Sequence, residues 1–165
     1  MSGKSEALPD PKWLARQAAE MLRRGAVGDP QLTKSGQAGP PWLVSTPDHE
    51  PHSWLIPVTV GDRFAAFFQF LLNGTLMRFS MFYQRPGEYR KCPIVMEWFD
   101  LPGLREKAAN HCWPGESAEE PFLTFDRSPD RVVWALPLRG PEGRVRLFFV
   151  AGDTIYSPPP SDTFG

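Results

Sequence analysis

The segment from Ser53 to Tyr83 limits the fold of this chain more than any other. Its apolar side chains recur at every second position, and Gly61-Asp62 and Asn73-Gly74 divide it into three runs. A period of two is typical of β-strands, and both dipeptides favour tight turns, the second a two-residue hairpin turn. The segment therefore predicts a three-stranded antiparallel meander. Pro57 has no backbone donor, which predicts that the first strand is an edge strand or is bulged there.

The middle run of this segment is apolar on both of its faces. One parity, which should form the buried face, consists of Phe64, Ala66, Phe68, Phe70 and Leu72. The other parity also carries large apolar side chains, among them Phe67 and Leu71. Successive side chains of a strand point to opposite faces, so the second face also needs a cover. We therefore expect Phe67 and Leu71 to be interaction residues, and we expect the partner to be another protein or a second copy in a homodimer.

The composition limits the classes of protein to which the chain can belong. Its 165 residues are 41% hydrophobic, and 18 basic and 19 acidic side chains give a net charge of −1. This balance provides no general attraction to nucleic acid or to a membrane. No signal peptide or membrane span is recognisable, and two cysteines are too few for a disulfide framework. We expect a soluble, cytoplasmic, single domain over residues 10–157, with disordered ends at 1–9 and at the proline-rich 158–165.

Two amphipathic helices are predicted on either side of the central meander. Asp10-Pro11 is a capping carboxylate followed by proline, and Gly25 ends the apolar stripe of the first helix. Asp100 is the expected cap of a second helix over residues 101–111. Residues 28–40 are predicted as a loop, and residues 94–99 are apolar but of uncertain type. Further short strands are expected at residues 41–46, 122–125, 132–138, 144–151 and 154–156.

The chain contains two segments with matching landmarks. Pro41 begins a short strand as Pro121 does, and Trp54 and Trp134 each stand three residues before a proline. Each set of strands follows a predicted helix. We interpret residues 10–83 and 100–156 as two tandem repeats of a helix and four strands. The expected fold is thus α+β, with two helices packed on an antiparallel meander sheet or sheets that have pseudo-two-fold symmetry.

The second of these segments resembles PepSY-like domains. The resemblance is carried by the tryptophan-bearing strand at Trp134 and by a strand that ends in the turn Ala151-Gly152-Asp153-Thr154. In that family the order of the residues in this turn differs, and the similarity covers about a third of the chain. The resemblance implies a non-catalytic binding or inhibitory module, which in that family is extracytoplasmic.

The histidines and cysteines are the residues of this chain that could serve as metal ligands or catalytic groups. His49 and His52 lie in a proline-bounded loop, and His111-Cys112 follows the second predicted helix, with Cys92 elsewhere in the chain. A zinc site needs three or four converging donors, and nothing in the spacing brings these segments together. A thiol at a helix C-terminus is also poorly activated as a nucleophile. We therefore predict no catalytic, metal or cofactor site and exposed turn positions for the histidines.

Aromatic and charged side chains suggest further contacts. Over residues 78–91, arginine and lysine alternate with aromatic residues, a pattern typical of proteins that bind single-stranded nucleic acid. However, Phe79 and Tyr83 fall on the apolar face of their strand. We therefore predict that these two rings lie in the core. Trp113, in a Trp-Pro-Gly turn, is the best candidate for an exposed anchor. The carboxylates of Glu116, Glu119, Glu120, Asp126 and Asp130 are predicted to be solvated loop groups.

Taken together, the sequence predicts a non-enzymatic protein-binding or assembly module that acts as a homodimer or with another protein. The alternative is a small ligand-binding protein or enzyme with a pocket between helices and sheet, using His49, His52 or Cys112. An exposed apolar patch favours the first, and a pocket with converging polar groups favours the second.

Overall fold

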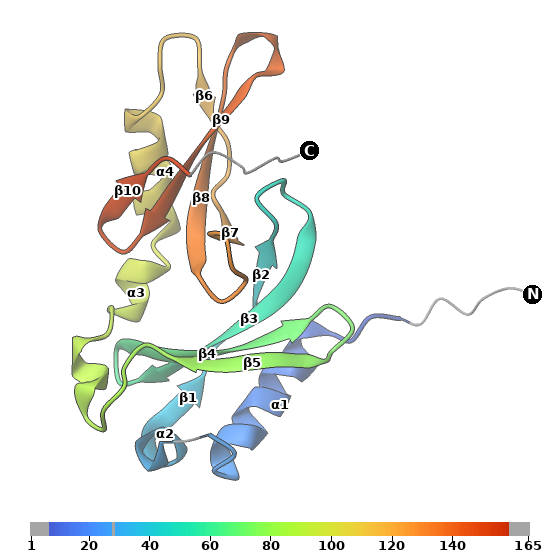
Figure 1. The fold of residues 1–165 in the computed structure, drawn as a ribbon, viewed down its shortest axis with the longest axis vertical. Helices are drawn as coiled ribbons and strands as arrows, with labels where there is room; N and C mark the ends of the chain where they lie inside the picture. The colour runs from blue at the N-terminus through green and yellow to red at the C-terminus, as the bar shows by residue number, and fades with distance from the viewer. Residues whose placement is uncertain (1–6, 28, 159–165) are drawn as a thin grey trace, which may run out of the picture. The chain divides into compact units, whose positions relative to one another are not determined.

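The computed structural model describes residues 7–27 and 29–158, and it has the α+β fold that the sequence predicts (Figure 1). Most of the two predicted disordered ends, 1–9 and 158–165, lies outside the described residues. The chain divides into two compact units: the first holds residues up to Val44 together with Pro51–Trp98, and the second holds Ser45–Glu50 and the residues from Phe99 onward. Among the described residues, no helix is long and apolar enough to cross a membrane.

The elements of the first unit follow the predicted order, with additions. They are α1 (Pro11–Arg23), α2 (Pro30–Ser35), β1 (Gly36–Ala38), β2 (Trp42–Ser45), β3 (Pro51–Val60), β4 (Arg63–Leu71), β5 (Leu76–Met81), the 3₁₀ helix η1 (Glu88–Lys91) and α3 (Val95–Trp98). The prediction of a loop over 28–40 was wrong, because α2 and β1 lie there. Asp29 caps α2 by accepting a hydrogen bond from the Gln31 amide at 2.8 Å.

Helix α1 begins and ends where the sequence indicates. Asp10 accepts a hydrogen bond from the Lys12 amide at 2.9 Å, and Pro11 occupies the first helical position. The buried stripe of α1 consists of Leu14, Ala18 and Leu22. These three side chains belong to one apolar cluster with residues of β3 and β4, chiefly Ile56, Val58, Phe68 and Phe70. This cluster is the core of the first unit.

Strand β3 is an interior strand, so of the two alternatives predicted at Pro57 the edge strand was wrong, whereas a bulge does lie close by, between Val58 and Thr59. Within the first unit the strand order is β2-β3-β4-β5, and β1 also pairs with β3. The Gly39 amide donates to the Pro57 carbonyl at 2.8 Å, so this carbonyl points toward the side of β1 and not toward β4. The amide and carbonyl groups of one residue in an antiparallel strand point to the same side of the strand. The nitrogen of Pro57, which has no hydrogen to donate, therefore also points away from β4, and the pairing of β3 with β4 loses no hydrogen bond there.

A β-bulge changes the predicted faces of β4. Val58 lies opposite Ala66, but Thr59 lies opposite Phe64, so one extra residue, Ala65, interrupts the alternation. Phe64 therefore shares a face with Phe67 and not with Phe68, which corrects the predicted parity. The ring centroids of Phe64 and Phe67 are 6.5 Å apart.

The turn between β4 and β5 lies at the predicted dipeptide but is longer than predicted. Strand β4 ends at Leu71 and β5 begins at Leu76, and the Leu71 amide donates to the Thr75 carbonyl at 2.8 Å. Only Gly74 of the dipeptide has a positive φ, at 94°. A two-residue hairpin turn was thus the wrong prediction, because the connection is four residues long.

The second unit contains α4 (Leu101–Asn110), β6 (Ser117–Ala118), β7 (Phe122–Phe125), β8 (Val132–Arg139), the 3₁₀ helix η2 (Pro141–Gly143), β9 (Val145–Ala151) and β10 (Thr154–Tyr156). The predicted cap of α4 is confirmed, because Asp100 accepts from the Gly103 amide at 3.1 Å. Strand order in this unit is β7-β8-β9-β10, with β6 also on β8, and these pairings are antiparallel.

The pairings around β3 and those around β8 correspond at an offset of 80, whereas the pairing of β4 with β5 and that of β9 with β10 do not share this offset. Pro57 lies opposite Phe67 in the first unit, and Pro137 lies opposite Leu147 in the second, 80 positions later in each case. The pairing of Ala38 with Val58 has its counterpart in Ala118 with Leu138, at the same offset of 80. A backbone hydrogen bond from Glu119 to Pro137, 2.9 Å long, likewise matches the one from Gly39 to Pro57.

Candidate functional site

Among the described residues of the second unit, Trp113 is the aromatic side chain with the largest accessible fraction. It follows α4 in the turn Trp113-Pro114-Gly115, and 62% of its surface is accessible. The Glu116 amide donates to the Trp113 carbonyl at 3.0 Å, and the Trp113 amide donates to a Glu116 carboxylate oxygen at 2.6 Å. Gly115 provides the positive φ, 85°, at which this turn reverses. The turn therefore fixes the backbone from which the indole projects.

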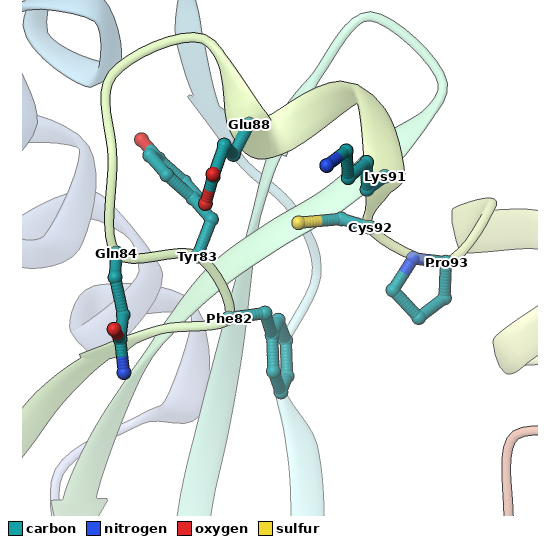
Figure 2. Close-up of a pocket in the computed structure, with 7 residues that line it drawn as sticks. All are labelled: Phe82, Tyr83, Gln84, Glu88, Lys91, Cys92 and Pro93. Atoms are coloured by element: carbon teal, nitrogen blue, oxygen red, sulfur yellow. The ribbon is translucent and has the colours of Figure 1, made fainter.

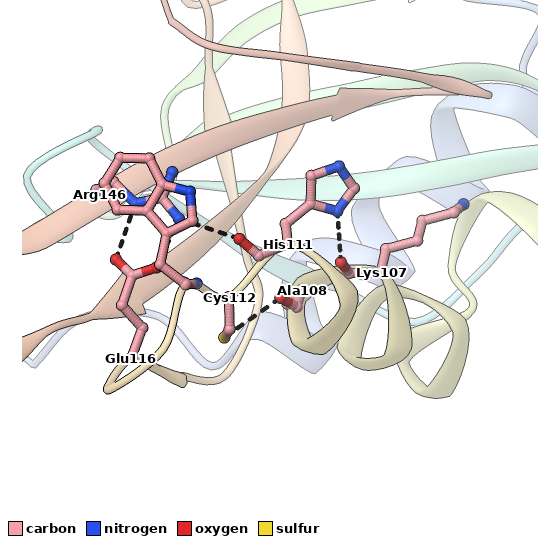
Figure 3. Close-up of polar contacts among 7 residues, drawn as sticks. Lys107, Ala108, His111, Cys112, Glu116 and Arg146 are labelled. Carbon is pink, nitrogen blue, oxygen red and sulfur yellow. Dashed lines mark hydrogen bonds and ion pairs between the residues drawn. The ribbon is translucent and has the colours of Figure 1, made fainter.

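Arg146, on β9, stacks on the indole of Trp113. Its guanidinium carbon is 3.4 Å from the ring centroid, well within the range of a cation–π contact. The guanidinium is itself held in place, as Figure 3 shows. It donates to both carboxylate oxygens of Glu116, at 2.8 and 2.6 Å, and to the His111 carbonyl at 3.0 Å. We call Trp113, Arg146, Glu116 and His111 the Trp113 platform.

The charges of the Trp113 platform are balanced. The hydrogen bonds from Arg146 lower the pKa of Glu116 to about 2, so this carboxylate is ionised at neutral pH. The side chain of Glu116 is 5% accessible and that of Arg146 is 21% accessible, so the ion pair is largely covered. A bidentate guanidinium–carboxylate pair also has a defined geometry. The platform therefore presents a fixed aromatic surface beside an arginine whose charge is neutralised by Glu116.

The predicted solvated carboxylates differ in their exposure: Glu120 and Asp130 are exposed, whereas Glu116 and Asp126 are covered, which corrects the prediction for these two. Glu119 pairs with Arg139, and Glu120 with Arg105 at 2.6 Å. Asp126 is 6% exposed and accepts a hydrogen bond from the Tyr156 hydroxyl at 2.7 Å. Together with Glu116, three of the five carboxylates thus have arginine partners, which lie on α4, β8 and β9.

The side chains of His111 and Cys112, which precede Trp113, contact backbone carbonyl groups at the end of α4. His111 Nδ1 lies 2.8 Å from the Lys107 carbonyl, and its ring centroid lies 5.2 Å from that of Phe148. The Cys112 thiol donates to the Ala108 carbonyl at 3.5 Å (Figure 3). Both side chains therefore satisfy carbonyl groups at the helix C-terminus, and this arrangement provides no base for the thiol.

The other two histidines have separate local partners. The ring of His49, which has a φ of 66°, stacks on Phe122 with centroids 4.0 Å apart. His52 is half-buried on β3, so its predicted exposed turn position was wrong, and its Nδ1 lies 3.0 Å from the hydroxyl of Ser53. Within residues 7–27 and 29–158, no three His, Cys, Asp or Glu side chains gather as metal ligands.

Phe67 and Leu71 differ from Trp113 in their exposure. Phe67 is 2% exposed, and its ring lies 5.5 Å from that of Phe82, so its side chain is not on the accessible surface. Leu71 is half-buried at the end of β4. Of the three predicted interaction residues, Trp113 is therefore the one whose side chain is mostly accessible.

A cavity of about 480 Å³ lies beside η1 in the first unit. Figure 2 shows its lining, which consists of Phe82, Tyr83, Gln84, Glu88, Lys91, Cys92 and Pro93. Burial raises the pKa of the Cys92 thiol, although the Arg63 guanidinium opposes this shift. The thiol is thus protonated at neutral pH and is not an activated nucleophile. Tyr83 is buried and Phe79 packs against the core cluster, so these rings do not form an exposed base-stacking platform.

Sequence reasoning found Trp113 but missed Arg146 and Glu116. Arg146 occupies the polar parity of β9, and 30 residues separate it from Glu116. No local pattern links an arginine on a strand to a glutamate in a turn, so only the strand register brings them together. A comparison of the chain with protein-family models, curated proteins and solved structures found no significant match.

Proposed function

We propose that the protein is a non-enzymatic protein-binding module whose main contact residue is Trp113. The observation that carries this proposal is the stacking of an indole, 62% accessible, on a guanidinium that is itself held by Glu116 and His111. Exposing so large an apolar ring has a cost in water, and fixing it lowers the entropy lost when a partner binds. Tryptophan and arginine are also the residues most enriched at interface hot spots.

The chemistry of the platform favours an apolar contact over a charged one. Arg146 covers one face of the indole, and its charge is neutralised by Glu116. The accessible surface of the ring is then suited to a proline, aliphatic or aromatic side chain of a protein partner, with the rim of the platform providing polar contacts. Nucleic acid and membrane lipid, which need uncompensated positive charge or a large apolar face, fit the platform less well.

A random peptide library displayed on phage tests this proposal. Peptides enriched on the wild-type protein should carry apolar or proline residues, and Trp113→Ala should weaken their binding by about 2 kcal/mol or more, as truncation of a hot spot does. Val145→Ala is the matched control, because Val145 is an exposed apolar residue of the same unit, 47% accessible, outside the platform. Equal binding to wild type and Trp113→Ala, or no enriched sequence at all, would contradict the proposal.

We further propose that the two units arose by tandem duplication. The offset of 80 positions between the pairings around β3 and those around β8 supports this proposal, as do the equivalent hydrogen bonds to Pro57 and Pro137. The two capped helices also support the duplication. In each helix a leucine is buried four positions after the capping aspartate and an alanine eight positions after it. These residues are Leu14 and Ala18 in α1, and Leu104 and Ala108 in α4. The additional helix α2 then distinguishes the first copy.

The resemblance to PepSY-like domains, carried by the strand of Trp134, stays a proposal and points to the same non-catalytic class. A cytoplasmic location is also proposed, in contrast to the location typical of that family. The support for it is that Cys92 and Cys112 are both free thiols, which suit a reducing compartment.

The cavity beside η1 favours a second candidate function, the binding of a small ligand. Its lining combines an exposed aromatic ring at Phe82 with the charged groups of Glu88 and Lys91. A volume of about 480 Å³ lies within the range of small-molecule sites. A fragment library screened by thermal shift tests it. Fragments that raise the melting temperature of the wild type but not of Glu88→Gln or Lys91→Gln would support this function, and fragments indifferent to both changes would contradict it.

A further inference from the structure

Strand β5 has an edge that no other strand covers. It pairs with β4 and is the last strand in the order of the sheet, and within the described residues nothing pairs with its outer side. Every residue of β5 is at least partly exposed, whereas the residues of β4 from Phe64 to Phe70 are all buried. Leu76 and Met81 at its ends are 38% and 39% accessible. The outer edge of β5 is thus a row of accessible backbone groups flanked by apolar side chains.

The direction of these backbone groups follows from one hydrogen bond. The Phe82 amide donates to the Ala65 carbonyl of β4 at 2.9 Å. Amide directions alternate along an antiparallel strand, and the register with β4 is regular from Arg78 to Met81. Arg78 and Ser80 therefore point their amide and carbonyl groups toward β4, while Phe79 and Met81 point theirs outward.

The usual protections of an edge strand are sparse in β5. Natural edges are shortened, or carry proline or inward-pointing charges, or are bulged. Strand β5 contains no proline and no lysine. Its one charged residue is Arg78, whose Nε is buried, and its bulge lies at its beginning, between the positions opposite Gln69 and Phe70, so that these protections do not extend over residues 79–81. By contrast, β10, the last strand of the second unit, is three residues long and is followed by Ser157-Pro158. Of these two terminal strands, β5 is the one able to accept another strand.

We propose that a second copy of this chain pairs with β5, strand to strand and antiparallel, about a two-fold axis at Phe79. In this register the outward-pointing groups of Phe79 exchange hydrogen bonds with those of Phe79 in the second copy. Arg78 of each copy lies opposite Ser80 of the other, so a cation meets a hydroxyl. An axis at Arg78 would instead place two arginines opposite each other, which is unfavourable.

The side chains favour this self-pairing over an unrelated strand. Phe79 packs against the core cluster of the first unit, and its ring centroid is 4.7 Å from that of Phe68. Two Phe79 rings on the same face of the paired strands would extend both cores across the axis. An isologous contact of this kind uses one surface twice, so each favourable contact occurs twice. These residues are separate from the Trp113 platform, and the inference does not depend on the proposed function.

Sedimentation equilibrium of the full chain tests the pairing. The wild type should show a reversible dimer. Met81→Pro should raise the dissociation constant of this dimer by roughly 100-fold or more, because the interface loses one hydrogen-bond donor at each of its two symmetric sites. Each loss is taken as about a factor of ten, which corresponds to about 1.4 kcal/mol. The outward direction of the Met81 amide means that its loss removes no hydrogen bond to β4. Met81→Lys provides a second variant should the proline disturb folding, and Val145→Lys, at an exposed position of β9, is the matched control.

A cross-linking experiment tests the register. The proposed pair of Arg78 with Ser80 of the second copy is a non-hydrogen-bonded pair, with an expected Cα separation of about 4.5 Å, close enough for a disulfide. In a Cys112→Ser background, Arg78→Cys mixed with Ser80→Cys should therefore form a disulfide-linked dimer under mild oxidation, while each variant alone should not.

Several outcomes would overturn the proposal. A wild type that is monomeric at every concentration, or Met81 variants that dimerise as the wild type does, would show that β5 is not the contact. A dimer that cross-links through Ser80→Cys alone would place the axis at Ser80 and reject the register. Trp113→Ala should leave the dimer unchanged, so loss of peptide binding and loss of self-association are read separately.

Discussion

The hydroxyl of Tyr83 donates a 2.5 Å hydrogen bond to the carboxylate of Asp29, a residue 54 positions earlier in the chain. Both side chains are buried, and the second oxygen of Asp29 accepts the Gln31 amide that begins α2. One carboxylate therefore caps a short helix and anchors the segment that follows β5. Burial and this hydrogen bond raise the pKa of Tyr83 well above its usual value of 10.0, so the phenol remains a donor throughout the neutral range.

Removing that hydroxyl should destabilise the first unit. We expect Tyr83→Phe to lower the free energy of unfolding by about 1.5–3 kcal/mol, the usual contribution of a hydrogen bond to a charged group. Urea denaturation followed by circular dichroism measures the change. Tyr89→Phe is the control, because it alters a half-buried neighbouring ring outside this pair and should cost less than about 0.5 kcal/mol. Equal losses for the two variants would show that the Asp29 contact is not the cause.

Features that depend on neighbouring residues were predictable from the sequence. Both long helices were located by a capping aspartate and a buried stripe, and the strands from β7 to β10 lie within one residue of the predicted ranges. The exposure of Trp113 was also predictable, because a Trp-Pro-Gly turn after a helix leaves few partners for the ring. Periodicity, capping and turn chemistry act over a few residues, and a single sequence displays them directly.

Features that depend on distant residues were not predictable. The bulge at Ala65 moves Phe64 to the other face of β4, and no residue type marks that position. Helix α2 is short and depends on Asp29, whose partner Tyr83 lies far along the chain. The contact of Arg146 with Glu116 follows from how β9 lies beside β8 and the turn after α4. In each case the tertiary pairing overrides a local pattern that is compatible with several structures.

Truncating Phe68 tests the assignment of the buried face of β4. Phe68 is fully buried and its ring contacts those of Phe70 and Phe79. We expect Phe68→Ala to lower the free energy of unfolding by about 3–5 kcal/mol, through lost burial and the cavity that remains. Phe82→Ala, which truncates a ring that is 46% accessible, should cost clearly less. A loss below about 1 kcal/mol for Phe68→Ala in chemical denaturation would mean that this face is not the core.

The turn between β4 and β5 depends on Gly74. Its φ of 94° is unfavourable for any side chain, and a Cβ there would lie 3.1 Å from Cγ of Pro9. We expect Gly74→Ala to destabilise by about 1–2 kcal/mol from the backbone alone, with the contact adding to it. Gly61→Ala is the comparison, because its φ is also positive, at 61°, but open space surrounds the added atom. Thermal unfolding should therefore show a larger loss for Gly74→Ala, and the reverse order would contradict the assignment of the contact.

Acid should release the ion pair that supports Trp113. The pKa of Glu116 is about 2 in the folded protein because of its hydrogen bonds from Arg146, compared with an ordinary value of 4.5. A carboxyl group whose pKa is lowered by folding stabilises the folded state above its unfolded pKa, and this stabilisation is lost as the pH falls through the folded value. The wild type should therefore exceed Glu116→Gln in stability by a constant amount above about pH 4.5.

Below that pH the difference between the two proteins should shrink progressively toward pH 2, because a protonated Glu116 resembles glutamine in charge and shape. Urea unfolding of both proteins at a series of pH values, followed by tryptophan fluorescence, measures this difference. Glu142→Gln, a change at an exposed glutamate of η2 outside the contact with Arg146, is the matched control. A stability difference for Glu116→Gln that stays constant throughout this acid range would mean that Arg146 does not hold Glu116 ionised.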